Sequence, residues 1–422
     1  MQLFTLLSVY TTGFLVSRLS VKYGLIESLL RRALNRRQHS MSRLVLWLIV
    51  LSAAISMFIP NFITALAMLP VLQSLIAQLA KKLNTRLARR AGTALGLAVI
   101  YGCNIGGMGS LVGSPANGLM LGAMGQLNVA GHDRINFLSW FGWSLPLVAI
   151  LIAIAWLVLM QLVLRGTDLD HHNDLIVGAS NEPPEPVKLI WLLCICWFAF
   201  WAVHSALQLT QVGPTSILLL FGLRLRWDSW EALAIAFGLV YLVLLFVPIW
   251  KQNGLNRRPI LNASDCFTRL PWPALLFVAG ALTLSGILIA LGLHQRLAAL
   301  ALMILPRELP QIILFFLMLF ITTMLTEFFN NTTIAVLLFP LYYALALELH
   351  LHPVLALMAV GLASTNAFMT PIATPVNALV YGGVQNFSLS RMLATGFLLN
   401  VISAICMAAF LTYYVAWFYQ LG

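Results

Sequence analysis

Prolines and polar residues interrupt long apolar stretches of this chain at residues 60–61, 113–117, 330–333 and 373–377. The side chains near these breaks that offer hydroxyl, amide or carboxyl groups are Ser56, Asn61, Thr64, Asn104, Ser110, Ser114, Asn117, Thr326, Glu327, Asn330, Asn331, Thr332, Thr333, Ser364, Thr365, Asn366, Thr370, Thr374 and Asn377. Such oxygens, with freed backbone carbonyls, suit a hard cation such as sodium, whereas N–H groups at a helix start attract anions. Because no Lys or Arg lies in these segments, a bound anion would be held by dipoles, amides and hydroxyls beside bound cations.

The elements that carry these breaks must be membrane helices. Hydrophobic residues make up 61% of the 422 positions and charged residues 9%, which leaves too little polar surface for a water-soluble fold. Apolar runs long enough to cross a hydrocarbon core of about 30 Å recur along the whole chain. Lipid cannot satisfy free backbone groups, so breaks in such helices persist where they line a cavity.

The basic residues indicate how the chain is oriented. They gather between Arg18 and Arg43 and between Lys81 and Arg90, and both clusters are predicted to be cytoplasmic. The uncharged stretch between them must enter the membrane and return, and its length favours a re-entrant hairpin. A second such stretch, 311–347, has few basic residues beside it, which predicts the opposite face for the loop around His350.

The chain contains an internal repeat in which the segment MFIPNFITALAMLP is similar to the segment EFFNNTTIAVLLFP. Asn61 then pairs with Asn331, and Pro70 with Pro340, at a constant separation. The segment GSPAN is likewise similar to the segment ATPVN. The predicted fold is an all-α polytopic membrane protein with inverted repeats, re-entrant hairpins and broken helices, an arrangement in which the site lies near the midplane. The predicted parts are a first repeat 1–165 (a helix, hairpin 44–80, broken helix 91–125, closing helix 138–164), a cytoplasmic loop and scaffold helices 166–271, and a second repeat 272–422 (a helix, hairpin 311–347, broken helix 353–384, closing helix 391–418).

Other interpretations of these features are less favourable. Small polar residues and glycines in membrane helices often only allow close helix packing, but matched breaks in both halves are hard to explain in that way. The net charge of +11 follows the loop bias rather than a nucleic-acid surface, and five scattered cysteines do not form a metal or disulfide framework. The Asp/His-rich segment 168–174 is interpreted as a solvated loop. Glu327 is a carboxylate inside an apolar stretch, and it could carry a proton or organise the site.

Four segments resemble a known family. TEFFNNTTIAVLLFP and AFMTPIATPVNALVYG resemble the second-repeat signatures of the divalent anion/sodium symporters, and MFIPNFITALAMLP and NIGGMGSLVGSPAN resemble the first-repeat signatures. The resemblance implies a secondary transporter of the inner (plasma) membrane rather than an enzyme. It also implies elevator-like motion, a homodimer, sodium ions as transported partners and a dicarboxylate, tricarboxylate or sulfate as substrate.

The resemblance also implies roles for individual residues. Those implied for the substrate are Asn61, Asn331, Thr332, Thr374, Pro375 and Ser114. Those implied for the second sodium site are Thr326, Asn330, Asn331 and the carbonyl of Ala373, and those for the first are Ser56, Asn61 and the carbonyl of Gly113.

The chain departs from the family pattern in two respects. The family's Ser-Asn-Thr tip reads Pro60-Asn61-Phe62 in the first repeat, which loses two hydroxyls. The family also carries further helices ahead of the position of Leu3, so the resemblance implies either a short member or an incomplete gene product. The SPAN text is similar to sodium/proton and arsenite transporters of the same superfamily, which leaves an antiporter or a metalloid exporter as the alternative.

Overall fold

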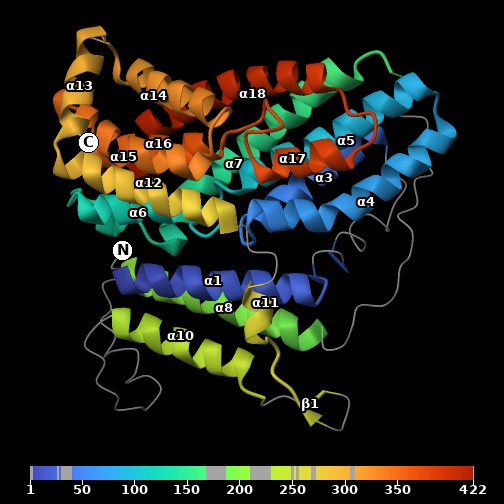
Figure 1. The fold of residues 1–422 in the computed structure, drawn as a ribbon, viewed down its shortest axis with the longest axis horizontal. Coiled ribbons are helices and arrows are strands. Elements are labelled where there is room, and N and C mark those ends of the chain that lie inside the picture. The colour runs from blue at the N-terminus through green and yellow to red at the C-terminus, as the bar shows by residue number, and fades with distance from the viewer. Residues whose placement is uncertain are drawn as a thin grey trace. The chain divides into compact units, whose positions relative to one another are not determined.

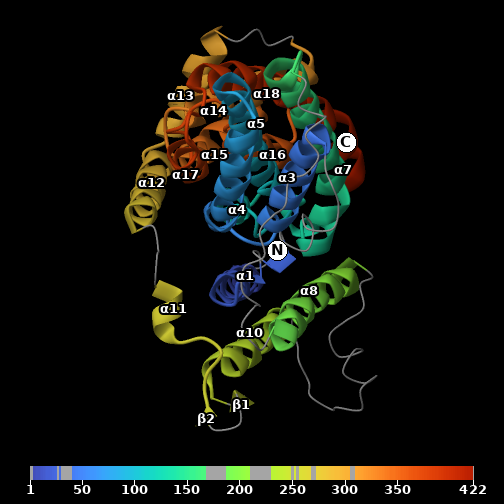
Figure 2. The ribbon, with the colours of Figure 1, turned by 90° about the vertical axis from the view of Figure 1, so that its right-hand side faces the viewer.

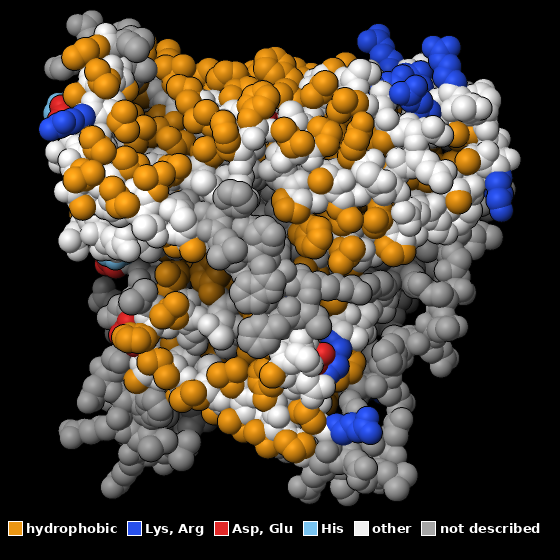
Figure 3. Space-filling model, viewed as in Figure 1, with side chains coloured by type: hydrophobic (Ala, Val, Ile, Leu, Met, Phe, Trp, Pro, Cys, Tyr) orange, Lys and Arg blue, Asp and Glu red, His pale blue; other side chains and the backbone are white. Residues whose placement is uncertain are grey.

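The computed structural model describes residues 3–25, 28–29, 40–167, 187–209, 230–248, 251–252, 256–267, 272–304 and 309–421. The predicted loop 168–174 lies outside the described residues, as does the segment 214–227, whose sequence is too short for a full span and is interpreted as interfacial or half-inserted. Within the described residues the regular secondary structure is helical apart from one pair of two-residue strands. Six of these helices are long and apolar enough to cross a membrane, or seven with one bent pair. The predicted fold class, a polytopic α-helical membrane protein, is confirmed. Hydrophobic side chains cover much of the visible surface, as expected of a protein whose solvent is lipid (Figure 3).

The chain divides into two compact units. Unit 1 comprises Met1–Leu25, Asp133–Gly142 and Asn181–Pro271, and unit 2 comprises Ile26–His132, Trp143–Ser180 and Trp272–Gly422. Unit 1 contains α1 (Leu3–Lys22), α8 (Val187–Leu209), α10 (Trp230–Phe246), β1 (Lys251–Gln252), β2 (Asn256–Arg257) and α11 (Ala263–Phe267). In both views α8 and α10 lie beside α1 (Figures 1 and 2). The antiparallel strands pair Lys251 with Arg257.

Unit 2 holds both predicted hairpins and both broken helices. Its first half contains α3 (Met41–Ser56), α4 (Asn61–Lys82), α5 (Thr85–Gly106) and α6 (Pro115–Gln126). It is followed by η1 (His132–Arg134), by α7 (Phe137–Leu159), which begins in unit 1, and by the π-helix η2 (Met160–Leu164). The second half contains α12 (Trp272–Ala290), α13 (Leu293–Ile304), α14 (Gln311–Thr326), α15 (Asn331–Glu348), α16 (Pro353–Thr365), α17 (Pro375–Gly383), α18 (Leu389–Ala409), the π-helix η3 (Phe410–Val415) and α19 (Ala416–Tyr419). The grouping of these helices into inverted repeats stays a prediction.

The helix breaks follow from local sequence. Pro60 precedes α4, and Pro115 and Pro375 occupy the first positions of α6 and α17, where a missing N–H costs nothing and the fixed φ favours a helix start. The cap hydroxyl is supplied by Ser114 in α6 and by Thr374 in α17.

The two halves of unit 2 pack crosswise. Helix α15 of the second hairpin contacts α6 of the first half, and α4 of the first hairpin contacts α17 of the second. In Figure 1 α4 extends to one side of unit 2, while α14 and α15 lie on the other. Each hairpin therefore packs against a broken helix of the other half.

Candidate functional site

The two broken helices share one backbone hydrogen-bond pattern. In the first, Asn117 Nδ2 donates to the carbonyl oxygens of Gly107 at 3.0 Å and Ser110 at 2.8 Å. In the second, Asn377 Nδ2 donates to Ala367 at 3.1 Å and Thr370 at 2.8 Å. One asparagine near the start of each second half-helix thus satisfies the carbonyls that its own break leaves free.

Each hairpin tip is fastened to the break of its own half by a hydroxyl. Ser110 Oγ donates to the carbonyl oxygen of Met57, and Thr370 Oγ1 donates to that of Glu327 at 2.6 Å. Met57 and Glu327 follow the last helical residues of α3 and α14. The two tips are therefore held in matching places, and matched positions can be compared directly.

The first tip brings together three of the residues predicted for the first sodium site. The Ser56 hydroxyl is buried and lies 2.6 Å from Asn61 Oδ1 and 2.9 Å from the Cys103 carbonyl oxygen. A Cβ at Gly107 would lie 2.8 Å from Asn61 Nδ2, and one at Gly113 would lie 2.9 Å from the Gly107 carbonyl oxygen. Asn61 and Gly113 therefore both lie against Gly107, where a side chain would clash with Asn61, and Ser56 lies next to Asn61.

At the second tip, the side chains predicted for the second sodium site differ in their hydrogen bonding. Thr326 is buried and its hydroxyl donates to the Thr323 carbonyl at 2.9 Å. Asn330 caps α15, since its Oδ1 accepts from Thr333 N at 3.1 Å. Asn331 Oδ1 is buried, and none of the described residues donates a hydrogen bond to it. A buried amide oxygen without a donor suits a cation or a polar ligand.

The remaining predicted substrate residues lie at the helix starts that follow each break. Thr374 is buried, caps α17 by accepting from Asn377 N at 3.0 Å, and lies next to buried Ala373. Ser114 caps α6 in the same way, by accepting from Ala116 N at 3.3 Å. Thr332 is half-buried in the first turn of α15, and Pro375 is exposed at the first position of α17.

Further polar side chains hold the site, of which sequence reasoning named Asn104 but missed Tyr101, Thr395 and Asn400. Asn104 Nδ2 donates to the Ala367 carbonyl at 2.7 Å, so α5 of the first half holds the break of the second. Tyr101 and Thr395 hydroxyls lie 2.7 Å apart. Asn400 on α18 donates to Glu327 at 2.7 Å. Thr395 and Asn400 lie outside the repeated motifs, and the one available signal was that each is a polar residue inside an apolar helix.

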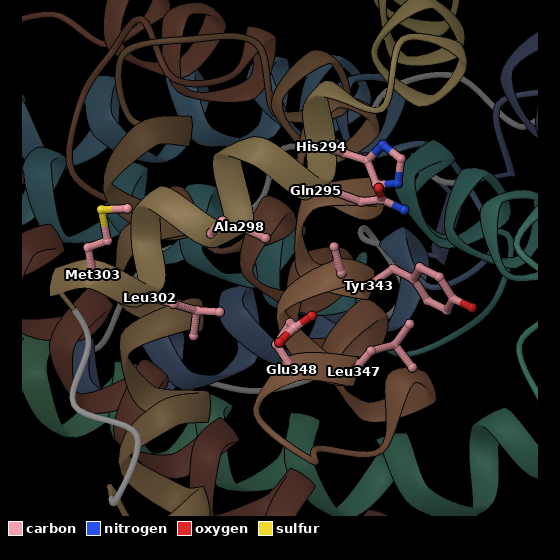
Figure 4. Close-up of a pocket in the computed structure, with 10 residues that line it drawn as sticks. His294, Gln295, Ala298, Leu302, Met303, Tyr343, Leu347 and Glu348 are labelled. Carbon is pink, nitrogen blue, oxygen red and sulfur yellow. The ribbon is translucent and has the colours of Figure 1, made fainter.

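A separate cavity of about 670 Å³ lies between α13 and α15 (Figure 4). Its walls include His294 and Gln295 from α13 and Tyr343 and Glu348 from α15. It contains none of the residues predicted for substrate or sodium.

Comparison with known proteins agrees with this architecture. The profile of a family described as citrate transporter matches residues 3–350 and, in a second overlapping match, 229–420. The chain belongs to the citrate transporter family. Members of this family are membrane transporters, and the sequence resemblance to divalent anion/sodium symporters is thereby confirmed.

The chain is also similar to individual transporters, two of which are described as dicarboxylate transporters. The chain is 24% identical to the sodium-dependent dicarboxylate transporter SdcS of Staphylococcus saprophyticus, over 94% of this chain and 74% of that protein. It is 26% identical to SdcS of Staphylococcus aureus, over 96% and 75%. An uncharacterized transporter of Haemophilus influenzae is 27% identical, over 86% and 71%.

One solved structure supports the fold alone. The YdaH transporter of Alcanivorax borkumensis, described as having an unusual topology, superposes with a TM-score of 0.58 at 16% identity. The match covers 98% of this chain and 86% of that one. A transporter fold therefore extends over the chain of this citrate transporter family member.

Proposed function

We propose that this protein is a secondary active transporter that couples sodium to the uptake of a small divalent anion, a C4-dicarboxylate or sulfate. The observation that carries the proposal is chemical. The hairpin and break segments of unit 2, residues 44–80, 91–125, 311–347 and 353–384, contain no Lys or Arg, yet they contain helix starts, hydroxyls and buried amide oxygens. A dianion at such a site needs cations beside it, since dipoles alone do not neutralise two charges.

The proposed residues are those that the tips and breaks present. The anion is contacted by Asn61, Asn331, Thr332, Thr374, Pro375 and Ser114. Thr326, Asn330, Asn331 and the Ala373 carbonyl form one sodium site, and Ser56, Asn61 and the Gly113 carbonyl form the other. The buried Asn331 Oδ1, to which none of the described residues donates a hydrogen bond, supports the second sodium site, the one that includes Thr326. Sodium is the co-transported ion, and the protein is proposed to act as a homodimer in the inner membrane.

The deciding experiment is uptake of labelled succinate, sulfate and citrate into proteoliposomes. An inward sodium gradient is expected to drive uptake of succinate or sulfate, and replacement of sodium by potassium is expected to abolish it. Uptake of the anion that follows a proton gradient in potassium would contradict sodium coupling. Proton or sodium exchange without any anion flux would favour the antiporter alternative.

Topology is tested by labelling single cysteines from outside the cell. Position 351 is expected to react and position 84 to stay protected, because the Lys81–Arg90 segment is proposed to be cytoplasmic. Labelling of position 84 alone would overturn this orientation.

A further inference from the structure

Glu327 is a completely buried carboxylate that faces only hydrogen-bond donors among the described residues. Its Oε1 accepts from the backbone N of Phe368 and of Met369, both at 2.8 Å, and from Asn400 Nδ2 at 2.7 Å. Its Oε2 accepts from Thr370 N at 2.8 Å. Four donors around one carboxylate suit its ionised form and fix its position.

Apart from Asn400 on α18, the residues that donate to the Glu327 carboxylate belong to the break itself. The N–H of the 367–368 peptide points to Glu327, while its carbonyl, on Ala367, accepts from Asn377 and Asn104. Gly396 lets α18 approach this backbone, because a Cβ there would overlap Phe368 and Met369. Both sides of the peptide plane are therefore held, and residues 368–370 cannot shift without breaking several hydrogen bonds.

The first half has the same hydroxyl fastening but lacks the carboxylate. Met57 stands where Glu327 stands, and its Cε would lie 2.6 Å from a Cβ at Gly109. The amides there bond to their own backbone instead: Met108 N donates to Ile105 O at 3.1 Å and Gly109 N to Gly106 O at 2.9 Å. The carboxylate is thus an addition specific to the second half.

The charge of Glu327 sits where a cation is favoured. It follows the C-terminal end of α14, where the helix dipole is already negative. No Lys or Arg lies in residues 311–348 or 353–384. Nearby, Oδ1 of Asn331, Asn366 and Asn400 is buried, and none of the described residues donates to it. A buried negative charge with unsatisfied oxygens around it stabilises a bound cation.

We propose that Glu327 is a positioning residue that makes the second tip the stronger cation site, whereas Met57 leaves the first tip without that charge. The proposal deepens the function proposed above and rests on it for the transport readout. Glu327 acts through the break residues and its fixed charge, and it does not carry a proton through the cycle.

The test compares Glu327→Gln with Glu348→Gln, which removes the same charge from the exposed far end of the same hairpin. In Glu327→Gln the sodium concentration for half-maximal uptake is expected to rise about tenfold or more, the effect of losing about 1.4 kcal/mol of interaction. The KM for the anion at saturating sodium is expected to change less than about threefold by the same scale. Glu348→Gln is expected to match the parent in both.

A second readout does not depend on transport. In detergent, sodium is expected to raise the melting temperature of the parent protein relative to choline, and this increase is expected to vanish in Glu327→Gln and to shrink in Asn400→Ala. Where Glu327→Gln does not fold, Asn400→Ala and Glu327→Asp decide by the same curves. The inference is overturned if the folded variants keep the parental dependence of uptake and of melting temperature on sodium concentration. It is also overturned if uptake by the parent has a proton-dependent component that Glu327→Gln loses, because Glu327 would then carry a proton.

The two proposals fail in distinguishable ways. A parent protein that moves no anion with sodium contradicts the proposed function. A parent protein that transports with sodium, but whose variants keep the parental sodium response in both readouts, contradicts only the role of Glu327.

Discussion

The first break of unit 2 is built from glycine backbone packed tightly against its neighbours, whereas the second is clamped by a carboxylate and side-chain amides. At Gly102 a Cβ would overlap Ser52, and at Gly106 it would overlap the Ala53 backbone. The matching stretch of the second half carries side chains. Besides Asn377, the counterpart of Asn117 in the first break, Glu327 and Asn104 also hold it through hydrogen bonds. Close packing of glycine backbone depends on shape alone, whereas the Glu327 carboxylate also adds a negative charge. The two halves can therefore share a fold and differ in chemistry.

The largest expected effect compares the two tip asparagines. Asn331→Ala is expected to reduce the initial rate of uptake more than tenfold, because a lost hydrogen bond to a charged group is worth about 1.5 to 3 kcal/mol. Asn61→Ala is expected to cost less, since Asn61 Oδ1 already lies within hydrogen-bond distance of the Ser56 hydroxyl. Rates are measured in proteoliposomes with matched protein content. An equal or larger loss in Asn61→Ala would remove the difference between the tips.

The glycine packing of the first break predicts a loss of stability. Gly106→Ala forces a Cβ into the backbone of Ala53, and overpacking of this kind costs about 1 to 3 kcal/mol. The melting temperature in detergent is expected to fall. Gly122→Ala on α6 is the control, because nothing lies within 4 Å of its Cβ position, and it is expected to keep the parental value. Equal melting temperatures for both variants would contradict the packing argument.

A smaller effect is expected at the aromatic residue beside the first tip. Phe62 is half-buried in the first turn of α4, where the resembling family has a hydroxyl. Phe62→Thr is expected to admit larger anions such as citrate, or to strengthen sodium dependence, by a few-fold or about 1 kcal/mol. Phe62→Leu keeps an apolar side chain and is the matched control. Competition of labelled succinate by unlabelled citrate measures the change, and identical competition curves for both variants would rule it out.

The smallest expected effect lies in unit 1 and serves as a control for the comparison. Partial burial works against ionisation of Asp265, but Lys22 Nζ at 2.7 Å and the Asn262 amide hold the pKa of Asp265 below its usual range. A carboxyl whose pKa is lower in the folded state adds stability above its unfolded pKa, and this contribution is lost as the pH falls through the folded value. Both side chains are partly exposed, so Asp265→Asn is expected to cost about 0.2 to 1 kcal/mol at neutral pH and nothing in acid. Melting curves at several pH values check this, and a change in the sodium response would be unexpected.

The sequence alone determined the solvent, the helical class and the places where helices break. Long uncharged, apolar runs must lie in lipid, and lipid requires them to be helical. Pro60, Pro115 and Pro375 mark helix starts because proline lacks an N–H and fixes φ. These are local properties, and they can be derived from residue type and spacing.

Tertiary structure decided which polar groups meet. Glu327 was identified from sequence as either a proton carrier or an organising carboxylate, but its donors come from residues 368–370 and from Asn400, far along the chain. Asn330, predicted as a sodium ligand, has its side-chain oxygen engaged in capping α15. Hydrogen bonds between distant segments depend on how helices pack, and helix packing is set by many side-chain shapes at once rather than by any short motif.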